Sequence, residues 1–223
     1  MNPCLCVISE GECDGYFYEL LAERVCGHGF QQYDSTPLPE GTNWRTVIST
    51  ARLKLNQIKH WKEKQEIAFI IAVDNDRTPN HPGAATTSLP LPPKDQAKAS
   101  RYVTLKQLVW DTLGEDRAKW PVRVALAIPV EMLESWVLLL LEPNREQPLP
   151  IFSEANQPTA IAYHRGKVPK QLKDLRDDDA KKRDLMQSEL FALATEQNLE
   201  AASEASPSLK MFLDELREWR FAG

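Results

Sequence analysis

The sequence has no long hydrophobic run and no recognisable leader. The longest apolar stretch, at 132–141, is interrupted by Glu134 and Ser135, so no segment reaches the 18 or more apolar residues that predict a membrane span. The first residues, MNPCLCVISEGE, lack the basic and small-residue pattern of a secretory signal. We therefore expect a cytoplasmic protein that does not contact a membrane.

The sequence also lacks an excess of positive charge. Its formal net charge is −5 over 223 residues, whereas a protein that coats nucleic acid electrostatically is usually basic. Any contact with nucleic acid should therefore be local or bridged by metal ions, which reverse the sign of an acidic site. The hydrophobic fraction of 42% is enough for one core with additions.

Cysteine is scarce and confined to the start of the chain. The four cysteines, at positions 4, 6, 13 and 26, form no C-x-x-C pair and are too unevenly placed for a disulfide framework. Together with His28 they offer zinc ligands in principle, but reduced and partly buried thiols are the favoured interpretation.

Short apolar runs mark the strands of the fold. The segments 5–9, 67–73 and 122–128 are apolar at nearly every position, which is typical of strands buried on both faces of a parallel sheet. A weaker strand is predicted within 30–35, where the alternation is poor.

Segments with helical spacing of apolar residues separate these strands. Helices are predicted at 14–25, 43–62, 105–113 and 131–141. Two more are expected near the C-terminus, the last with Ser206 as its N-cap and Pro207 at its first position.

The alternation of strands and helices predicts an α/β fold with a mostly parallel central sheet of about four strands and helices on both faces. We expect a core domain at 1–142 and a helical extension at 143–223 packed on it. Within the core, 77–100 is rich in Pro, Thr and Ser and has no periodicity, so we interpret it as a long loop that is either functional or disordered.

Acidic residues follow the predicted strands. Glu10 comes after the first strand, Asp74 and Asp76 come after the third, and Glu134 lies in the helix after the fourth. Ligands of open parallel sheets bind beyond the carboxyl ends of the strands. Carboxylates gathered there repel one another unless a cation neutralises them, and their hard oxygens suit Mg²⁺ or Mn²⁺.

These motifs carry a family resemblance. The strings VISEGECDGYFYELL and FIIAVDND resemble the Toprim domain, in which a Glu after the first strand and an Asp-x-Asp after a later one bind catalytic Mg²⁺. Glu10-Gly11 followed by Asp14 resembles the OLD (overcoming lysogenization defect) class of Toprim nucleases. AIPVEMLESWVLLLL and SPSLKMFLDEL are similar to a small bacterial Toprim-like family of unassigned function, often encoded beside an OLD-type ATPase.

The resemblance implies a role for each acidic residue. Glu10 would be a metal ligand or would handle the proton of the attacking water, and Asp74 and Asp76 would bind Mg²⁺. Asp14 and Glu134 would complete a second metal position. A basic residue near the scissile phosphate is also implied, and the basic stretch with Lys167, Lys170 and Lys173 could supply it.

The implied activity is hydrolysis of phosphodiester bonds in nucleic acid, with DNA favoured over RNA. The implied setting is anti-phage defence or DNA repair beside an OLD-type ATPase of the ABC class, and a homodimer is compatible with it.

Several residues have ordinary structural explanations. Asp14 suits the first turn of a helix through the helix dipole alone. Asn75 and Asp76 could form an Asx turn after the strand. A carboxylate at Glu134, on so apolar a helix, needs a partner, which could be an Arg instead of a metal.

Two other functions compete with a nuclease. IIAVDNDRT also matches the signature of haloacid-dehalogenase-type phosphatases, with Asp74 as nucleophile, Asp76 as acid/base and Thr78 in support. That motif normally follows the first strand of its domain, whereas about 70 residues of alternating elements precede it here. The second competitor is a non-catalytic Toprim-fold subunit that acts with its ATPase partner.

Overall fold

The computed structural model describes residues 3–11, 14–32, 43–59, 66–74, 101–129, 133–141, 184, 188 and 190–221. The strands are β1 (Cys4–Ile8), β2 (Gln31–Gln32), β3 (Ile67–Ala72) and β4 (Arg123–Ala127), and the longer helices are α1 (Asp14–Cys26), α2 (Trp44–Lys59), α4 (Arg101–Leu113), α5 (Glu134–Leu141), α10 (Glu196–Ala205) and α11 (Pro207–Arg217). Two three-residue helices, η2 (Arg117–Lys119) and α9 (Phe191–Leu193), complete the described elements.

The strands form one parallel sheet in the order β2-β1-β3-β4. Three of them, β1, β3 and β4, have five or six residues, and β2 adds a two-residue pairing beside β1. The predicted α/β class and parallel sheet are confirmed.

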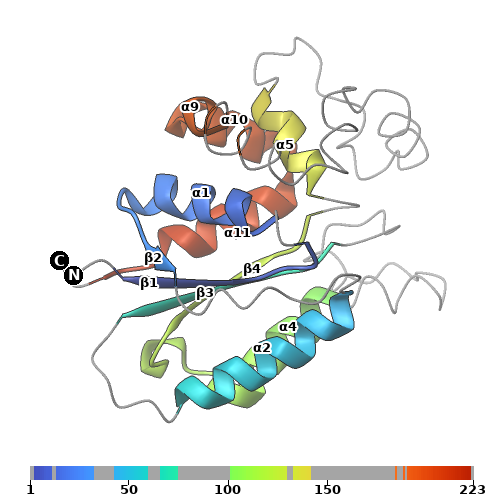
Figure 1. Cartoon of the computed structure of the whole chain (residues 1–223), viewed down its shortest axis with the longest axis vertical. Coiled ribbons are helices and arrows are strands. Elements are labelled where there is room, and N and C mark those ends of the chain that lie inside the picture. The colour runs from blue at the N-terminus through green and yellow to red at the C-terminus, as the bar shows by residue number, and fades with distance from the viewer. Residues whose placement is uncertain are drawn as a thin grey trace.

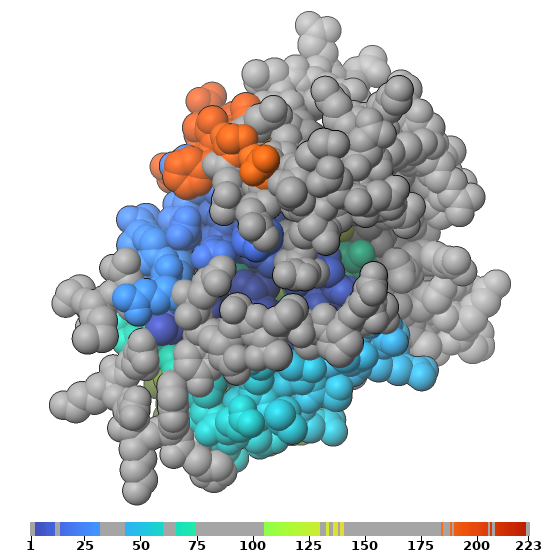
Figure 2. Space-filling model, viewed as in Figure 1, coloured from blue at the N-terminus to red at the C-terminus, as the bar shows by residue number. Residues whose placement is uncertain are grey.

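Helices cover the sheet on both faces (Figure 1). α2 and α4 pack on one face and α1 and α11 on the other, with α5 and α10 lying over α1 and α11 (Figure 1). In the space-filling view, β1 is seen only between α1 above and α2 below (Figure 2). None of the described helices is long and apolar enough to cross a membrane.

The alanines of β3 and β4 all lie on one face of the sheet. On β3, Phe69 and Ile71 face α2 and α4, whereas Ala68 and Ala72 face α1 and α11, because successive side chains of a strand alternate between faces. β4 repeats the pattern with small Ala125 and Ala127 on the α1 and α11 side; these alanines leave room for large rings.

Three aromatic rings fill that space. Tyr18 of α1 lies edge-on to Trp136 of α5 and Phe212 of α11, at centroid distances of 6.3 and 5.9 Å, and Trp136 stacks on Phe212 at 5.6 Å. Trp136 Nε1 also donates a hydrogen bond to Ser208 Oγ at 3.2 Å, so the buried indole is satisfied. The cluster joins elements from both ends of the chain.

The last helix begins as predicted. The Ser206 side chain accepts a hydrogen bond from the backbone N–H of Leu209, and Pro207 occupies the first turn. The predicted apolar stripe is fully buried and comprises Leu209, Phe212, Leu213 and Leu216. α11 packs on β4 and α1 within the same apolar core. The predicted domain boundary at 142/143 and the predicted loop at 77–100 lie outside the described residues.

The cysteines that the structure describes form no disulfide with one another. Cys4 and Cys6 are buried in β1, and Cys26 at the end of α1 donates a weak S–H hydrogen bond to the Leu216 carbonyl. Burial raises the pKa of the Cys26 thiol to about 11, which makes it a poor nucleophile and a poor metal ligand near neutral pH. Cys13 lies outside the described residues.

Candidate functional site

Glu10 and Asp74 meet at the carboxyl end of the sheet. Each follows its strand by two residues, and the register pairs Ile8 of β1 with Ile71 of β3. Glu10 Oε1 accepts a hydrogen bond from the backbone N–H of Asp74 at 3.1 Å. The carboxylate after one strand thus reaches across to the end of its neighbour.

Gly11 gives Asp14 room to approach this turn. A Cβ on Gly11 would lie 2.6 Å from Asp14 Oδ2, so the Asp14 carboxylate lies directly against the Gly11 Cα. The Ser9 hydroxyl, largely buried, donates a hydrogen bond to the Gly11 carbonyl at 2.8 Å and holds the turn closed. Glycine here permits a close approach that a larger residue would obstruct.

Asp14 is also the first residue of α1. A carboxylate there is stabilised by the helix dipole, so its position suits both the metal and the structural interpretation. The structure adds that the Asp14 carboxylate lies against Gly11, the residue that follows Glu10.

The chemistry of these side chains fits a hard divalent cation, because all three offer carboxylate oxygens. Among the residues that the structure describes, however, no group of three or more His, Cys, Asp or Glu side chains is close enough to hold a metal ion. The structure thus brings Glu10 to Asp74 and Asp14 to Gly11, without assembling a complete metal shell from them.

The other predicted site residues lie outside the described part of the chain. This applies to Asp76 and to the basic residues Lys167, Lys170 and Lys173. Glu134 is the first residue of α5, which follows β4, but its side chain is not among those described.

A buried carboxylate that sequence reasoning missed lies elsewhere, at the outer edge of β4. Glu215 of α11 is 12% exposed and accepts a hydrogen bond from the backbone N–H of Leu126 at 2.7 Å. Burial raises the pKa of Glu215 from its ordinary 4.5 to about 7, although the Leu126 N–H and nearby Arg117 oppose the rise. The only sequence signal is its place beside Leu216, on the flank of the apolar stripe.

Comparison with known proteins adds no family. No protein-family model matches the chain, and no curated protein or solved structure matches it either. The function is therefore proposed from the chain's own residues, their arrangement and the resemblance of their motifs.

Proposed function

We propose that this chain is a Mg²⁺- or Mn²⁺-dependent nuclease of the Toprim type, which hydrolyses phosphodiester bonds of nucleic acid in the cytoplasm. The observation that carries the proposal is the hydrogen bond from the Asp74 N–H to the Glu10 carboxylate. It joins the two acidic motifs, 64 residues apart in sequence, at the end of a parallel sheet where ligands bind.

The acidic residues would form two metal positions. Glu10, Asp74 and Asp76 would hold one metal ion, and Asp14 with Glu134 would hold a second. Bound metal would lower the pKa of a water molecule and neutralise the charge of the scissile phosphate. A carboxylate has two oxygens, so Glu10 can accept the Asp74 N–H with Oε1 and still offer Oε2 to a cation.

The Glu10 contact also favours this function over a phosphatase of the haloacid-dehalogenase type. In the phosphatase the roles belong to Asp74, Asp76 and Thr78, and its further acidic residues come from strands after that motif, whereas Glu10 follows a strand that precedes it. Asp74 also follows the third strand of the sheet in chain order, not the first.

The substrate and partners of the proposal come from the resemblance. DNA is the preferred substrate over RNA, and an OLD-type ATPase is the expected partner in anti-phage defence or DNA repair. A homodimer is compatible with both.

The test is cleavage of plasmid DNA and of RNA with Mg²⁺ or Mn²⁺ by the purified chain and three variants. Glu10→Gln keeps an oxygen that can accept the Asp74 N–H but removes the charge, and Asp74→Asn does the same for the second ligand. Asp111→Asn is the matched control, because Asp111 is exposed on α4 and bonds only with Gln107 in the described structure.

The proposal expects metal-dependent cleavage by the parent chain and by Asp111→Asn, and none by the other two variants. Release of phosphate from small phosphomonoesters, lost in Asp74→Asn but kept in Glu10→Gln, would identify a phosphatase instead. Absence of both activities, with tight binding to the ATPase, would identify a non-catalytic subunit.

A further inference from the structure

A hollow of about 170 Å³ lies at the outer edge of β4 and contains none of the residues of the proposed metal site. Its lining comes from α4, η2, β4 and α11, and comprises Lys106, Val109, Trp110, Arg117, Trp120, Val124, Leu126 and Glu215. A shallower hollow shares Arg117, Trp120, Val124 and Glu215 and continues toward Arg220.

The edge of β4 presents backbone groups to this hollow. The Val73 N–H donates a hydrogen bond to the Ala127 carbonyl, so the odd-numbered residues of β4 direct their backbone N–H and C=O groups toward β3. Val124 and Leu126 therefore direct their N–H and C=O groups outward. Glu215 takes the Leu126 N–H, and Val124, two residues earlier, lines both hollows.

The apolar part of the lining is rigid. Trp120 is 7% exposed, and its Nε1 donates a hydrogen bond to the Gly114 carbonyl at 2.6 Å, which fixes the ring. Val124 and Leu126 are buried beside it. A dry cavity of about 150 Å³ is large enough to bind benzene, so this hollow matches a single six-membered ring.

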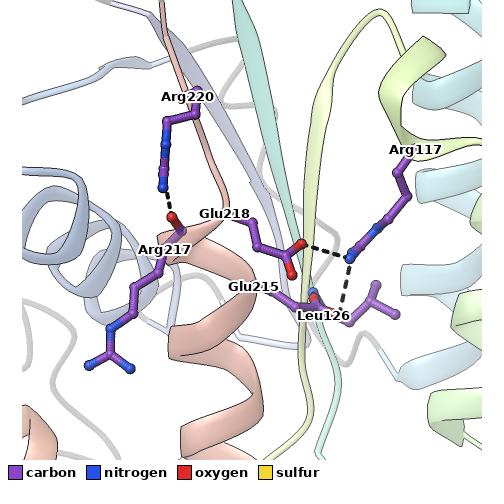
Figure 3. A network of polar contacts seen from close by, with 6 residues as sticks. All are labelled: Arg117, Leu126, Glu215, Arg217, Glu218 and Arg220. Atoms are coloured by element: carbon purple, nitrogen blue, oxygen red, sulfur yellow. Dashed lines mark hydrogen bonds and ion pairs between the residues drawn. The ribbon is translucent and has the colours of Figure 1, made fainter.

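Two cations and one carboxylate converge on the hollow. Lys106 Nζ lies 4.5 Å from the centre of the Trp110 ring, and Arg117 reaches across from η2 to α11. Arg117 pairs with Glu215 at 3.6 Å and with the more exposed Glu218 at 3.0 Å (Figure 3). The two cations balance Glu215 and Glu218, so once Glu215 is protonated the charge around the hollow favours an anion.

Glu215 is the group whose charge can change near neutral pH. Its pKa of about 7 comes chiefly from burial, and the charged neighbours that act on it are Arg117 of η2, Lys106 of α4 and Glu218 of its own helix. A carboxyl group with a perturbed pKa that lines a cavity with apolar walls and converging polar groups is the usual mark of a ligand site.

We propose that this hollow binds a small monocyclic carboxylate. The ring would lie against Trp120 and Val124, and the carboxylate would pair with Arg117 and Lys106. The site is separate from the proposed metal site, and the proposal does not depend on nuclease activity.

Binding should take up a proton on Glu215. Its Oε2 accepts the Leu126 N–H and its Oε1 faces Arg117, so the proton would reside on Oε1. From there the protonated Glu215 would donate an O–H hydrogen bond to the ligand carboxylate, which replaces Glu215 as the partner of Arg117. Two carboxylates side by side without that proton would repel each other.

The test is titration of the full chain with benzoate, followed by calorimetry and by the tryptophan fluorescence of the hollow. We expect saturable binding at pH 6 that weakens by about tenfold at pH 8, since the neutral fraction of a group with a pKa near 7 falls by that factor. Benzylamine and benzamide, of similar shape but without the negative charge, should bind at least about tenfold more weakly at pH 6.

Variants assign the binding to this hollow. Arg117→Gln and Lys106→Gln should each weaken benzoate, and Glu215→Gln should remove most of the pH dependence because its amide does not titrate. Arg217→Gln is the matched control, since Arg217 is exposed on the same helix, pairs with Asp214 and does not line the hollow.

Three results would overturn the proposal: no saturable binding of benzoate at pH 6, equal binding of benzylamine, or unchanged affinity in both Arg117→Gln and Lys106→Gln. Two variants are used so that loss of folding in one, checked by circular dichroism, does not decide the outcome.

Discussion

Two glutamates of this molecule make the same hydrogen bond in opposite surroundings. Glu10 accepts the N–H of Asp74 at the carboxyl end of the sheet, and Glu215 accepts the N–H of Leu126 at its outer edge. The N–H that Glu10 accepts belongs to an acidic residue, Asp74, whereas Glu215 also pairs with a cation, Arg117. The comparison teaches that backbone donors position a carboxylate, and the neighbouring charges determine what can neutralise it.

The largest expected effect is a pH dependence of the unfolding free energy that comes from Glu215. Glu215 has a higher pKa in the folded chain than its ordinary 4.5, so the folded state binds its proton more tightly. Its contribution to stability is therefore full below about pH 4.5 and is lost as the pH rises through about 7. The loss amounts to at most about 3 kcal/mol.

Urea denaturation of the parent chain and of Glu215→Gln from pH 4.5 to 8 measures this contribution. The difference in unfolding free energy between the two should shift in favour of the variant as the pH rises. A constant difference across the range would show that Glu215 does not titrate there.

The second largest effect on stability is expected when Glu215 is replaced by a residue that cannot accept the Leu126 N–H. Glu215→Leu leaves the buried Leu126 N–H without its partner, which costs about 1–3 kcal/mol of unfolding free energy. The measurement belongs at pH 5, where Glu215 is neutral and loss of a buried charge does not offset the cost. Stability equal to that of Glu215→Gln at pH 5 would contradict the role of this hydrogen bond.

Gly11→Ala tests the close approach of Asp14. The new Cβ would lie 2.6 Å from Asp14 Oδ2, so the carboxylate must rotate away, at a cost of about 0.5–1.5 kcal/mol. Thermal unfolding of Gly11→Ala and of the double variant with Asp14→Ala measures it. Once Asp14→Ala has removed the carboxylate, adding Gly11→Ala should cost no further stability. If Gly11→Ala costs as much in the Asp14→Ala chain as in the parent chain, the contact is not the cause.

Glu10→Gln should have the smallest effect on stability. Its amide oxygen can still accept the Asp74 N–H, so the unfolding free energy should change by less than about 1 kcal/mol. Urea denaturation checks this, and a loss above about 3 kcal/mol would indicate that Glu10 is needed mainly for folding.

Much of the fold was predictable because its signals are local. The all-apolar run of β3 and the Ser206-Pro207 start of α11 each specify their structure within a few residues. The proximity of Glu10 to Asp74 also followed, since neighbouring parallel strands end at one edge.

The burial of Glu215 could not be predicted in the same way. It depends on the packing of α11 beside the outer edge of β4, a contact between residues 89 positions apart. On the helix itself, Glu215 is only a polar residue on the flank of the stripe that contains Phe212 and Leu216. The arrangement of Arg117 across the same edge is likewise a product of tertiary packing.

The most direct measurement of the central claim is binding of Mn²⁺ to the purified chain, followed by electron paramagnetic resonance, for the parent, Glu10→Gln, Asp74→Asn and Asp111→Asn. The account predicts saturable binding by the parent and by Asp111→Asn, and affinity at least about tenfold weaker in the other two. Equal affinity in all four chains would contradict a metal site built on Glu10 and Asp74.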